Sequence, residues 1–306
     1  MKRDIVIHEV GLRDGLQMEH RTVPIETKVA WAGELMQAGV DILQIGSFVH
    51  PEKVPQMRDT DELFRHFAAA YPHRRTVLAG LVLNEKGLER GLACGVDMFC
   101  MGVSASETHS RKNTGMGVDE AVGRITAMAR TAQEAGKKVQ VSVQSAFGCG
   151  YEGAVSPARV TDIVAKYLEA GFGNVSLADT AGHATPGQVE ELFGAIRDMD
   201  ARAELTCHFH NTYGLAMANT WAALGAGVKY VESSVAGLGG CPFTRIAGGN
   251  LCTEDFVHML QRMDLRLDLD LATLIGTARS VAAFFERDLP GAVYRTGPIA
   301  EPRPAS

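Results

Sequence analysis

The chain has few of the features that mark membrane, secreted or nucleic-acid-binding proteins. Its 306 residues carry 30 Lys and Arg against 36 Asp and Glu, so no basic surplus favours a nucleic-acid backbone as partner. Gly, Lys or Asp interrupts the longest apolar runs far short of a bilayer span. The first residues, MKRDIVIHEVGLRDG, lack the apolar segment of a signal peptide. We therefore expect a cytoplasmic protein with no membrane and no nucleic-acid partner.

Cysteine is also scarce, and none of the six cysteines forms a CxxC pair, so a structural zinc knuckle is not expected. A chain of this length, 46% hydrophobic, has enough apolar material for a large core without disulfides. We expect reduced and mostly buried cysteines. The exception is Cys241, which lies in a glycine-rich segment discussed below.

Short β-rich runs alternate with longer amphipathic runs along the chain. The expected strands are 4–10, 40–46, 76–83, 97–103, 138–144, 174–178, 204–209 and 229–235. The expected helices are 25–38, 59–69, 85–94, 119–135, 157–170, 187–199, 214–226 and 252–263. Strict βα alternation requires a parallel sheet, and eight units fit a closed (β/α)8 TIM barrel of roughly 250 residues. A doubly wound open sheet is the main alternative, but GLRDGLQ after the first strand is not the GxGxxG turn.

No linker or low-complexity segment divides the chain. We expect one TIM-barrel domain over residues 1–306, with the barrel at about 4–263. A C-terminal extension, 264–306, should add one more helix near 270–287.

In such a barrel the active site lies at the C-terminal ends of the strands. His208 and His210 stand two residues apart at the end of the seventh strand, so both side chains share one face. Asp14, after the first strand, supplies a carboxylate, and Asn250 an amide oxygen. This mixed set suits Mg²⁺ or Mn²⁺, with Zn²⁺ as an alternative. The competing interpretation is a pair of hydrogen-bonded structural histidines.

Other polar residues are expected at the same end of the barrel. Arg13 would stabilise a developing enolate, or would form only a salt bridge at the rim. Cys241, in GLGGCP, would lie on a closing flap as an acid, base or thiol contact, or would fill apolar space. Asp179 would orient a ligand or transfer a proton, or would only cap the following turn. Gln44 and Ser47 end the second strand.

Taken together, these residues and their surroundings resemble the hydroxymethylglutaryl-CoA lyases. The resemblance spans nearly the whole chain and is most specific in its last two segments. The matching segments are EVGLRDGLQ (9–17), GSFVHPEKVPQM (46–57), GCGYEGAVSP (148–157), SLADTAGHATP (176–186), CHFHNTYGLAMANT (207–220) and SSVAGLGGCPFTRIAGGNLCTED (233–255).

The resemblance implies Mg²⁺- or Mn²⁺-dependent cleavage of 3-hydroxy-3-methylglutaryl-CoA to acetyl-CoA and acetoacetate. It implies that the metal ligands are Asp14, His208, His210 and Asn250. It further implies that Arg13 stabilises the thioester enolate, that Cys241 is the flap cysteine, and that His208 or Cys241 returns the proton. Asp179 is implied as an active-site carboxylate and Glu254 as a supporting one in the substrate pocket. Leucine breakdown would be the pathway.

Four positions depart from the family pattern. Gln44 stands where the family has glutamate, Gln140 where it tends to have arginine, Gln144 in place of serine, and His20 in place of lysine near the coenzyme A entry. These changes favour either drift with compensation or an altered acyl pocket for a different 3-hydroxyacyl-CoA. A metal-dependent aldolase or condensing enzyme and a non-catalytic acyl-CoA-binding protein are the further alternatives.

The contacts with coenzyme A are weakly specified by the sequence. His20 and three residues expected on a loop after the fourth strand (Ser104, Ser106 and Asn113) are the candidates. Barrels of this kind often form homodimers, and a homodimer is the expected assembly.

Overall fold

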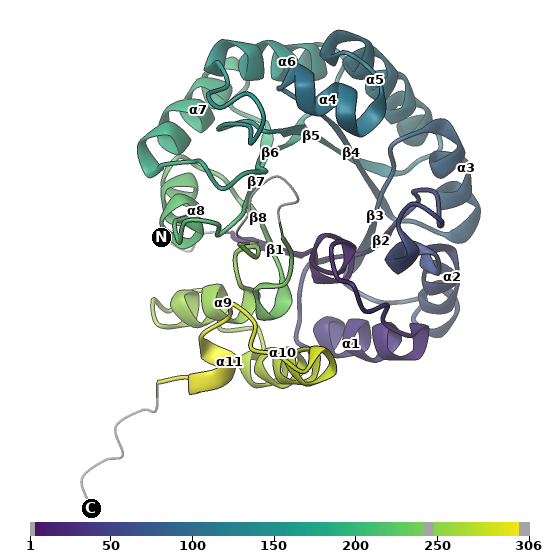
Figure 1. Ribbon diagram of the computed structural model, residues 1–306, viewed down its shortest axis with the longest axis vertical. Coiled ribbons are helices and arrows are strands. Elements are labelled where there is room, and N and C mark those ends of the chain that lie inside the picture. Colours follow the sequence, from purple (N-terminus) through teal and green to yellow (C-terminus); the bar gives the residue numbers. More distant parts are fainter. Residues whose placement is uncertain (1–3, 241–247, 300–306) are drawn as a thin grey trace, which may run out of the picture.

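The computed structural model describes residues 4–240 and 248–299. In these residues, eight parallel strands close into a barrel in sequence order, and β1 pairs with both β2 and β8 (Figure 1). The strands are β1 (Val6–Glu9), β2 (Ile42–Ser47), β3 (Val77–Leu81), β4 (Met98–Ser104), β5 (Lys138–Gln144), β6 (Asn174–Asp179), β7 (Glu204–Phe209) and β8 (Tyr230–Ser233). The closed barrel is therefore confirmed, and the open sheet is excluded.

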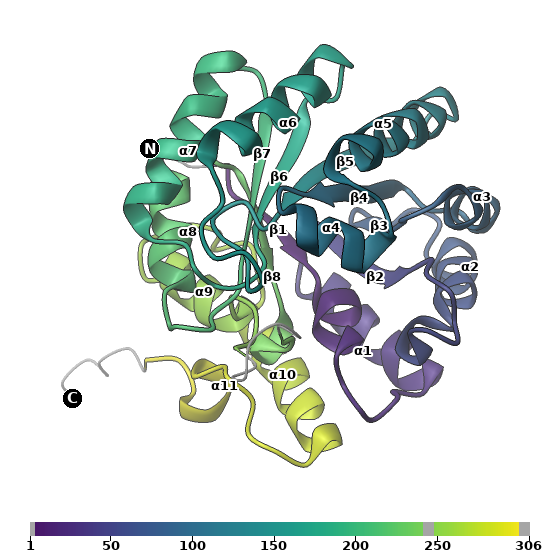
Figure 2. The same cartoon turned by 45° about the horizontal axis from the view of Figure 1, so that its top comes forward.

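Helices surround the barrel, as Figures 1 and 2 show. They are α1 (Ile25–Gln37), α2 (Thr60–Ala70), α3 (Glu85–Cys94), α4 (Glu107–Thr114), α5 (Val118–Glu134), α6 (Pro157–Glu169), α7 (Pro186–Met199), α8 (Ala216–Gly225), α9 (Thr253–Gln261), α10 (Leu271–Phe285) and α11 (Val293–Thr296). Every expected helix and strand is present, with ends within two residues of the prediction. Among the described residues, no helix combines the length and apolar character that a bilayer span requires.

The expected loop after the fourth strand was wrong in part, because that segment contains α4. Ser106 caps this helix by accepting a hydrogen bond from the His109 backbone N–H (3.1 Å). Gly115 ends it with a φ of 77°, in the left-handed region. The helix is short and polar, so it lacks the apolar period by which the longer helices are predicted. Asn113 accordingly lies on a helix.

Side-chain alternation along each strand separates the barrel interior from the layer beneath the helices. On β7, Cys207 and Phe209 belong to the main hydrophobic core, whereas Thr206 bonds to Gln140 inside the barrel and His208 lines a cavity there. A second, smaller apolar cluster packs near the N-terminal ends of the strands; its buried members are Ile42, Ala79, Met98 and Cys100. The interior is thus apolar at one end and polar toward the other.

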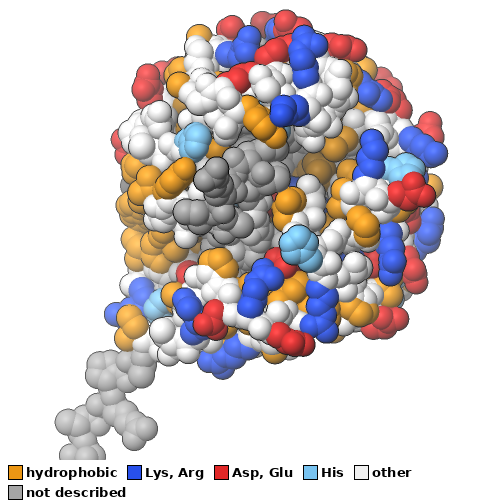
Figure 3. Space-filling view, viewed as in Figure 1, with side chains coloured by type: hydrophobic (Ala, Val, Ile, Leu, Met, Phe, Trp, Pro, Cys, Tyr) orange, Lys and Arg blue, Asp and Glu red, His pale blue; other side chains and the backbone are white. Residues whose placement is uncertain are grey.

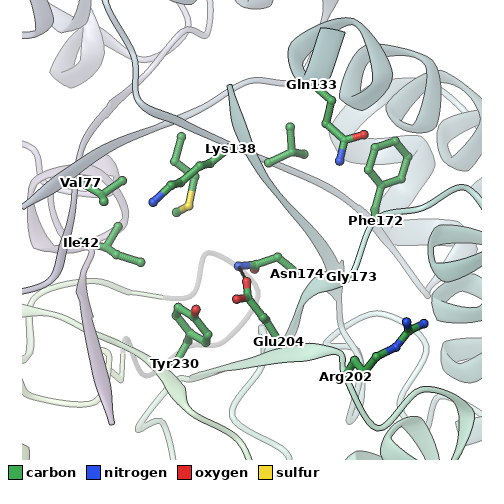
Figure 4. Close-up of a pocket in the computed structure, with 12 residues that line it drawn as sticks. Ile42, Val77, Gln133, Lys138, Phe172, Gly173, Asn174, Arg202, Glu204 and Tyr230 are labelled. Atoms are coloured by element: carbon green, nitrogen blue, oxygen red, sulfur yellow. Dashed lines mark hydrogen bonds between the residues drawn. The ribbon is translucent and has the colours of Figure 1, made fainter. Parts of the chain in front are cut away.

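A cavity of about 480 Å³ lies at the N-terminal end of the barrel, with side chains from several strands around it (Figure 4). Its acidic group, Glu204, already accepts a hydrogen bond from Asn174 (3.0 Å). The described residues form no histidine-containing cluster around it. Enzymes of this fold carry their chemistry at the opposite end, so we place the candidate site there.

Candidate active site and metal centre

The turn after β1 is shaped by a buried carboxylate. Glu9 accepts hydrogen bonds from the backbone N–H of Gly11 (2.7 Å) and of Val235 (3.0 Å), and from the Thr253 hydroxyl. A Cβ on Gly11 would lie 2.6 Å from the Glu9 carboxylate and 2.9 Å from Val235, so only glycine fits there. This tight turn leads into a short helical segment, Gly11–Gly15, which presents Arg13 and Asp14 at the barrel mouth.

Arg13 and Asp14 form a partly buried ion pair at the C-terminal end of the barrel. The Arg13 Nη1 donates to Asp14 Oδ1 (2.6 Å), and the Arg13 Nε donates to the side-chain oxygen of Gln44. Burial alone would raise the pKa of Asp14. The charges of Arg13, His208 and His210, with a hydrogen bond from Asn250, instead hold that pKa well below its usual range. Asp14 is therefore ionised and able to bind a cation.

His208, on β7, and His210, just after the end of that strand, both lie close to Asp14. Their Nε2 atoms lie 3.9 Å and 3.7 Å from Asp14 Oδ2, and the three residues offer ligand atoms that all lie within 4.8 Å of one another. Burial lowers the pKa of His210 to about 4, which keeps its imidazole neutral. For His208, burial also lowers the pKa, but Glu232 and Asp14 outweigh it and the net direction is upward.

Asn250 completes the cluster through a backbone bridge to His210. Its amide nitrogen donates to Asp14 Oδ2 (2.8 Å) and to the Leu238 carbonyl (3.0 Å). Its side-chain oxygen is buried and has no hydrogen-bond partner among the described residues. An unpaired buried acceptor beside an ionised carboxylate and two imidazoles fits a divalent cation. The predicted ligands Asp14, His208, His210 and Asn250 therefore lie together as expected, and they fit a metal.

The sequence reasoning missed Glu232, a buried residue of β8 inside the barrel. Its carboxylate lies 2.8 Å from the Nδ1 of His208, and its other oxygen lies 3.6 Å from the Nδ1 of His8. Burial raises the pKa of Glu232, yet the bond to His208 and the nearby positive charges bring the net direction downward. A glutamate within the predicted strand that contains YVESSV was the available signal, because charged residues are rarely buried without a partner.

A cavity of about 320 Å³ opens beside these residues. Its wall includes Arg13, Asp14, His208 and His210, together with three of the predicted pocket residues, Gln44, Gln140 and Gln144. Asn113 and His109, both from α4, also line it. In the view of Figure 3, basic side chains lie around the margin of this face. The cavity therefore joins the metal cluster to the predicted acyl pocket.

Several predicted residues lie off the wall of this cavity, as the described part of the chain defines it: Ser47, Asp179, Glu254, His20, Ser104 and Ser106. Ser104 accepts a hydrogen bond from the backbone of Ser106 (3.1 Å), and Ser106 caps α4. Glu254 accepts from the Ala236 N–H (3.0 Å), and burial raises its pKa to about 8. Glu254 therefore supports the loop after β8 and lies off the cavity wall as the described residues define it, and its supporting role in the substrate pocket stays a prediction.

Asp179 takes the capping role that was its alternative interpretation. Its two carboxylate oxygens accept hydrogen bonds from the backbone N–H groups of His183 (2.8 Å) and Ala184 (3.0 Å). Its neighbour Ala178 lines the cavity, and alternation along β6 turns the next side chain to the other face. Asp179 thus shapes the loop after β6 and has no direct contact with the cavity in the described structure.

Asp179→Asn is expected to lower the free energy of unfolding by about 1–3 kcal/mol, because one buried N–H loses its acceptor. Burial raises the pKa of Asp179 from 3.8 to about 6. Between these values the folded state holds a proton that the unfolded state releases, so the contribution of Asp179 falls as pH rises. Urea unfolding at about pH 4.5 and pH 7 tests this. A deficit in the variant that grows toward pH 7 would contradict the assignment.

The predicted flap cysteine, Cys241, lies outside the described residues. The other cysteines, Cys94, Cys100, Cys149, Cys207 and Cys252, are all buried and carry free thiols, as expected. Burial raises the pKa of Cys100 and Cys207, and the nearby Glu232 carboxylate raises it further, so neither thiol is activated as a nucleophile.

Comparisons with known proteins agree with this geometry. The hydroxymethylglutaryl-CoA lyase of Bacillus subtilis is 35% identical over 94% of this chain and 95% of its own length. The human mitochondrial hydroxymethylglutaryl-CoA lyase is 37% identical over 94% of this chain and 87% of its own length. A solved HMG-CoA lyase from Acinetobacter baumannii, in complex with coenzyme A and 3-methylmalate, superposes with a TM-score of 0.91 at 33% identity, covering 99% of this chain and 98% of that one.

The HMGL-like family profile matches residues 4–281, which include the whole barrel and each of the four predicted metal ligands. The relatives at more than 30% identity cover this chain almost completely. The chain therefore belongs to the HMGL-like family.

Proposed function

We propose that this protein is a divalent-metal-dependent carbon–carbon lyase that cleaves 3-hydroxy-3-methylglutaryl-CoA to acetyl-CoA and acetoacetate. The observation that carries the proposal is the cluster of Asp14, His208, His210 and Asn250 beside Arg13, at the mouth of the barrel of an HMGL-like family member. The chain is similar to hydroxymethylglutaryl-CoA lyases over most of their length.

The metal site would take Mg²⁺ or Mn²⁺, because carboxylate, amide and imidazole ligands suit these cations. When bound, the cation would act as a Lewis acid toward the hydroxyl and carboxylate oxygens of the substrate. Asp14 is ionised and His210 is neutral, so both are in the state that a ligand requires. The acyl group would lie against the wall formed by Gln44, Gln140 and Gln144.

The reaction breaks the bond between C2 and C3 of the acyl group. A base takes the proton from the oxygen of the C3 hydroxyl group, and C3 becomes the ketone carbon of acetoacetate. The electron pair of the broken C2–C3 bond moves to C2 as a thioester enolate. Arg13 would stabilise the enolate oxygen, because its Nε and Nη1 are held by Gln44 and Asp14 while its Nη2 makes no hydrogen bond within the described residues. A proton from His208 or Cys241 then converts C2 to the methyl group of acetyl-CoA.

Coenzyme A would enter along the cavity mouth, where Asn113 and His109 of α4 lie. His20 is exposed and follows the helical segment Gly11–Gly15 in sequence, and it is a further candidate for the contact with coenzyme A. A cytoplasmic location, a homodimeric assembly and a place in leucine breakdown remain predictions from the sequence.

Acetyl-CoA release tests the proposal directly. We expect Mg²⁺-dependent turnover of 3-hydroxy-3-methylglutaryl-CoA that disappears with EDTA and returns with Mn²⁺. Cys241→Ala should lower kcat by about 10²–10⁴-fold if this thiol transfers a proton. Cys149→Ala, which removes a buried thiol outside the cavity, is the matched control and should keep kcat near the wild-type value.

The other outcomes are equally informative. Turnover of a different 3-hydroxyacyl-CoA, with 3-hydroxy-3-methylglutaryl-CoA inert, would assign the changed specificity to the wall of three glutamines. If neither 3-hydroxy-3-methylglutaryl-CoA nor any other 3-hydroxyacyl-CoA tested released acetyl-CoA, the lyase function would be refuted.

A further inference from the structure

The two histidines of the metal cluster differ in what holds their second ring nitrogen. The Nδ1 of His208 lies 2.8 Å from the Glu232 carboxylate, and both groups are buried. The Nδ1 of His210 is buried and has no hydrogen-bond partner among the described residues. Only His208 is therefore held by a side chain on the side away from Asp14.

The contact with Glu232 determines where the proton of a neutral His208 lies. A carboxylate without a proton only accepts hydrogen bonds, so Nδ1 must carry the hydrogen. The lone pair is then on Nε2, the atom that lies 3.9 Å from Asp14 and faces the metal cluster. A rotated ring, or the other tautomer, would direct an N–H at the cation.

The surroundings of Glu232 hold the carboxylate in this place. Glu232 is 6% exposed and His208 5%, so both partners are largely removed from bulk solvent although both line the cavity. On its other side lies His8, 0% exposed, whose Nδ1 is 3.6 Å from Glu232 Oε1, beyond a direct hydrogen bond. The pairing β7–β8 sets His208 directly opposite Glu232 in register, and β1–β8 does the same for His8.

We propose that Glu232 is a positioning residue that keeps His208 in the Nδ1–H tautomer and in the orientation needed to bind the divalent cation. The inference rests on the proposed metal-dependent function and deepens it, because it names what orients one of the ligands. Outer carboxylates of this kind typically change metal affinity by about 10–100-fold when removed.

Manganese binding to the full-length protein, followed by EPR of free Mn²⁺ after removal of endogenous metal, tests the inference. Glu232→Gln keeps the volume but places an amide against Nδ1, and we expect about 10–100-fold weaker Mn²⁺ binding. Glu232→Asp keeps the charge on a shorter side chain and should recover part of the affinity. Thr206→Val removes another buried hydrogen bond of the barrel interior, to Gln140, and should leave Mn²⁺ affinity within about twofold.

A second measurement reads the tautomer of His208 in the wild-type protein itself. Nitrogen-15 NMR of the histidine rings in the wild-type protein, with the His208 signals assigned by their loss in His208→Gln, should report the Nδ1–H tautomer before metal is added. The inference would be overturned by an Nε2–H tautomer, or by wild-type Mn²⁺ affinity in a folded Glu232→Gln variant. In either case, acetyl-CoA release by the wild-type protein would still support the lyase function. A wild-type protein that neither binds Mn²⁺ nor releases acetyl-CoA would overturn both.

Discussion

Asp14→Asn is expected to abolish tight Mn²⁺ binding and to lower the rate of thioester cleavage by about 10³-fold, equivalent to about 4 kcal/mol. The carboxylate is the one acidic group among the four predicted ligands, and each of its oxygens accepts a hydrogen bond, from Arg13 (2.6 Å) and from Asn250 (2.8 Å). An asparagine removes the charge and turns an NH₂ group toward one of these donors. Both effects loosen the cluster.

Mn²⁺ titration and single-turnover acetyl-CoA release measure the two consequences separately. Asp97→Asn is a suitable control, because that carboxylate accepts bonds from Arg74 (2.6 Å) and the Leu78 backbone (2.9 Å) away from the cavity. It should cost stability and leave metal affinity unchanged. Tight Mn²⁺ binding by Asp14→Asn would remove Asp14 from the ligand set.

Arg13→Ala is expected to lower kcat by about 10²–10³-fold while Mn²⁺ binds equally well or more tightly. The guanidinium donates to Asp14, so its positive charge opposes a cation at that carboxylate even as it would stabilise the enolate oxygen. Removing it should therefore separate catalysis from metal binding. Arg13→Lys keeps the charge but loses the paired contacts to Gln44 and Asp14, so its kcat should lie between those of the wild type and Arg13→Ala.

The measurements are steady-state kinetics with saturating Mg²⁺ and the same Mn²⁺ titration. Arg90→Ala removes an arginine that pairs with Asp61 on the outer layer, and should change neither quantity. If Arg13→Ala lost metal binding and kcat in parallel, Arg13 would be a support of the metal site and not the stabiliser of the enolate.

Gln44 illustrates a change whose effect depends on its neighbours. Its side-chain oxygen accepts from the Arg13 Nε, so the amide preserves the orientation of the guanidinium without adding a negative charge. Asp14 is then the partner that balances the charge of Arg13. This geometry shows that glutamine at position 44 is compatible with an ordered Arg13, which supports the lyase interpretation over a non-catalytic binding protein.

The sequence by itself determined the barrel and predicted which residues would gather at its mouth. Eight strand patterns separated by helical patterns predict a parallel sheet, and the C-terminal ends of parallel strands lie at the same end of a barrel. His208 and His210 share a face because strand side chains alternate, and Asp14 and Asn250 follow strand ends. Local periodicity was sufficient for these features, since each depends on spacing along the chain.

The tertiary structure alone decided the contacts between strands. Asp179 lies at the end of the sixth strand, as predicted. Because side chains alternate along that strand, its carboxylate points away from the cavity and accepts hydrogen bonds from two backbone N–H groups. Glu232 meets His208 only because β7 and β8 pair in a particular register. The unpaired oxygen of Asn250 follows from its amide donating to Asp14. Such contacts depend on register and on competition among hydrogen-bond partners far apart in the chain, which spacing along one sequence does not encode.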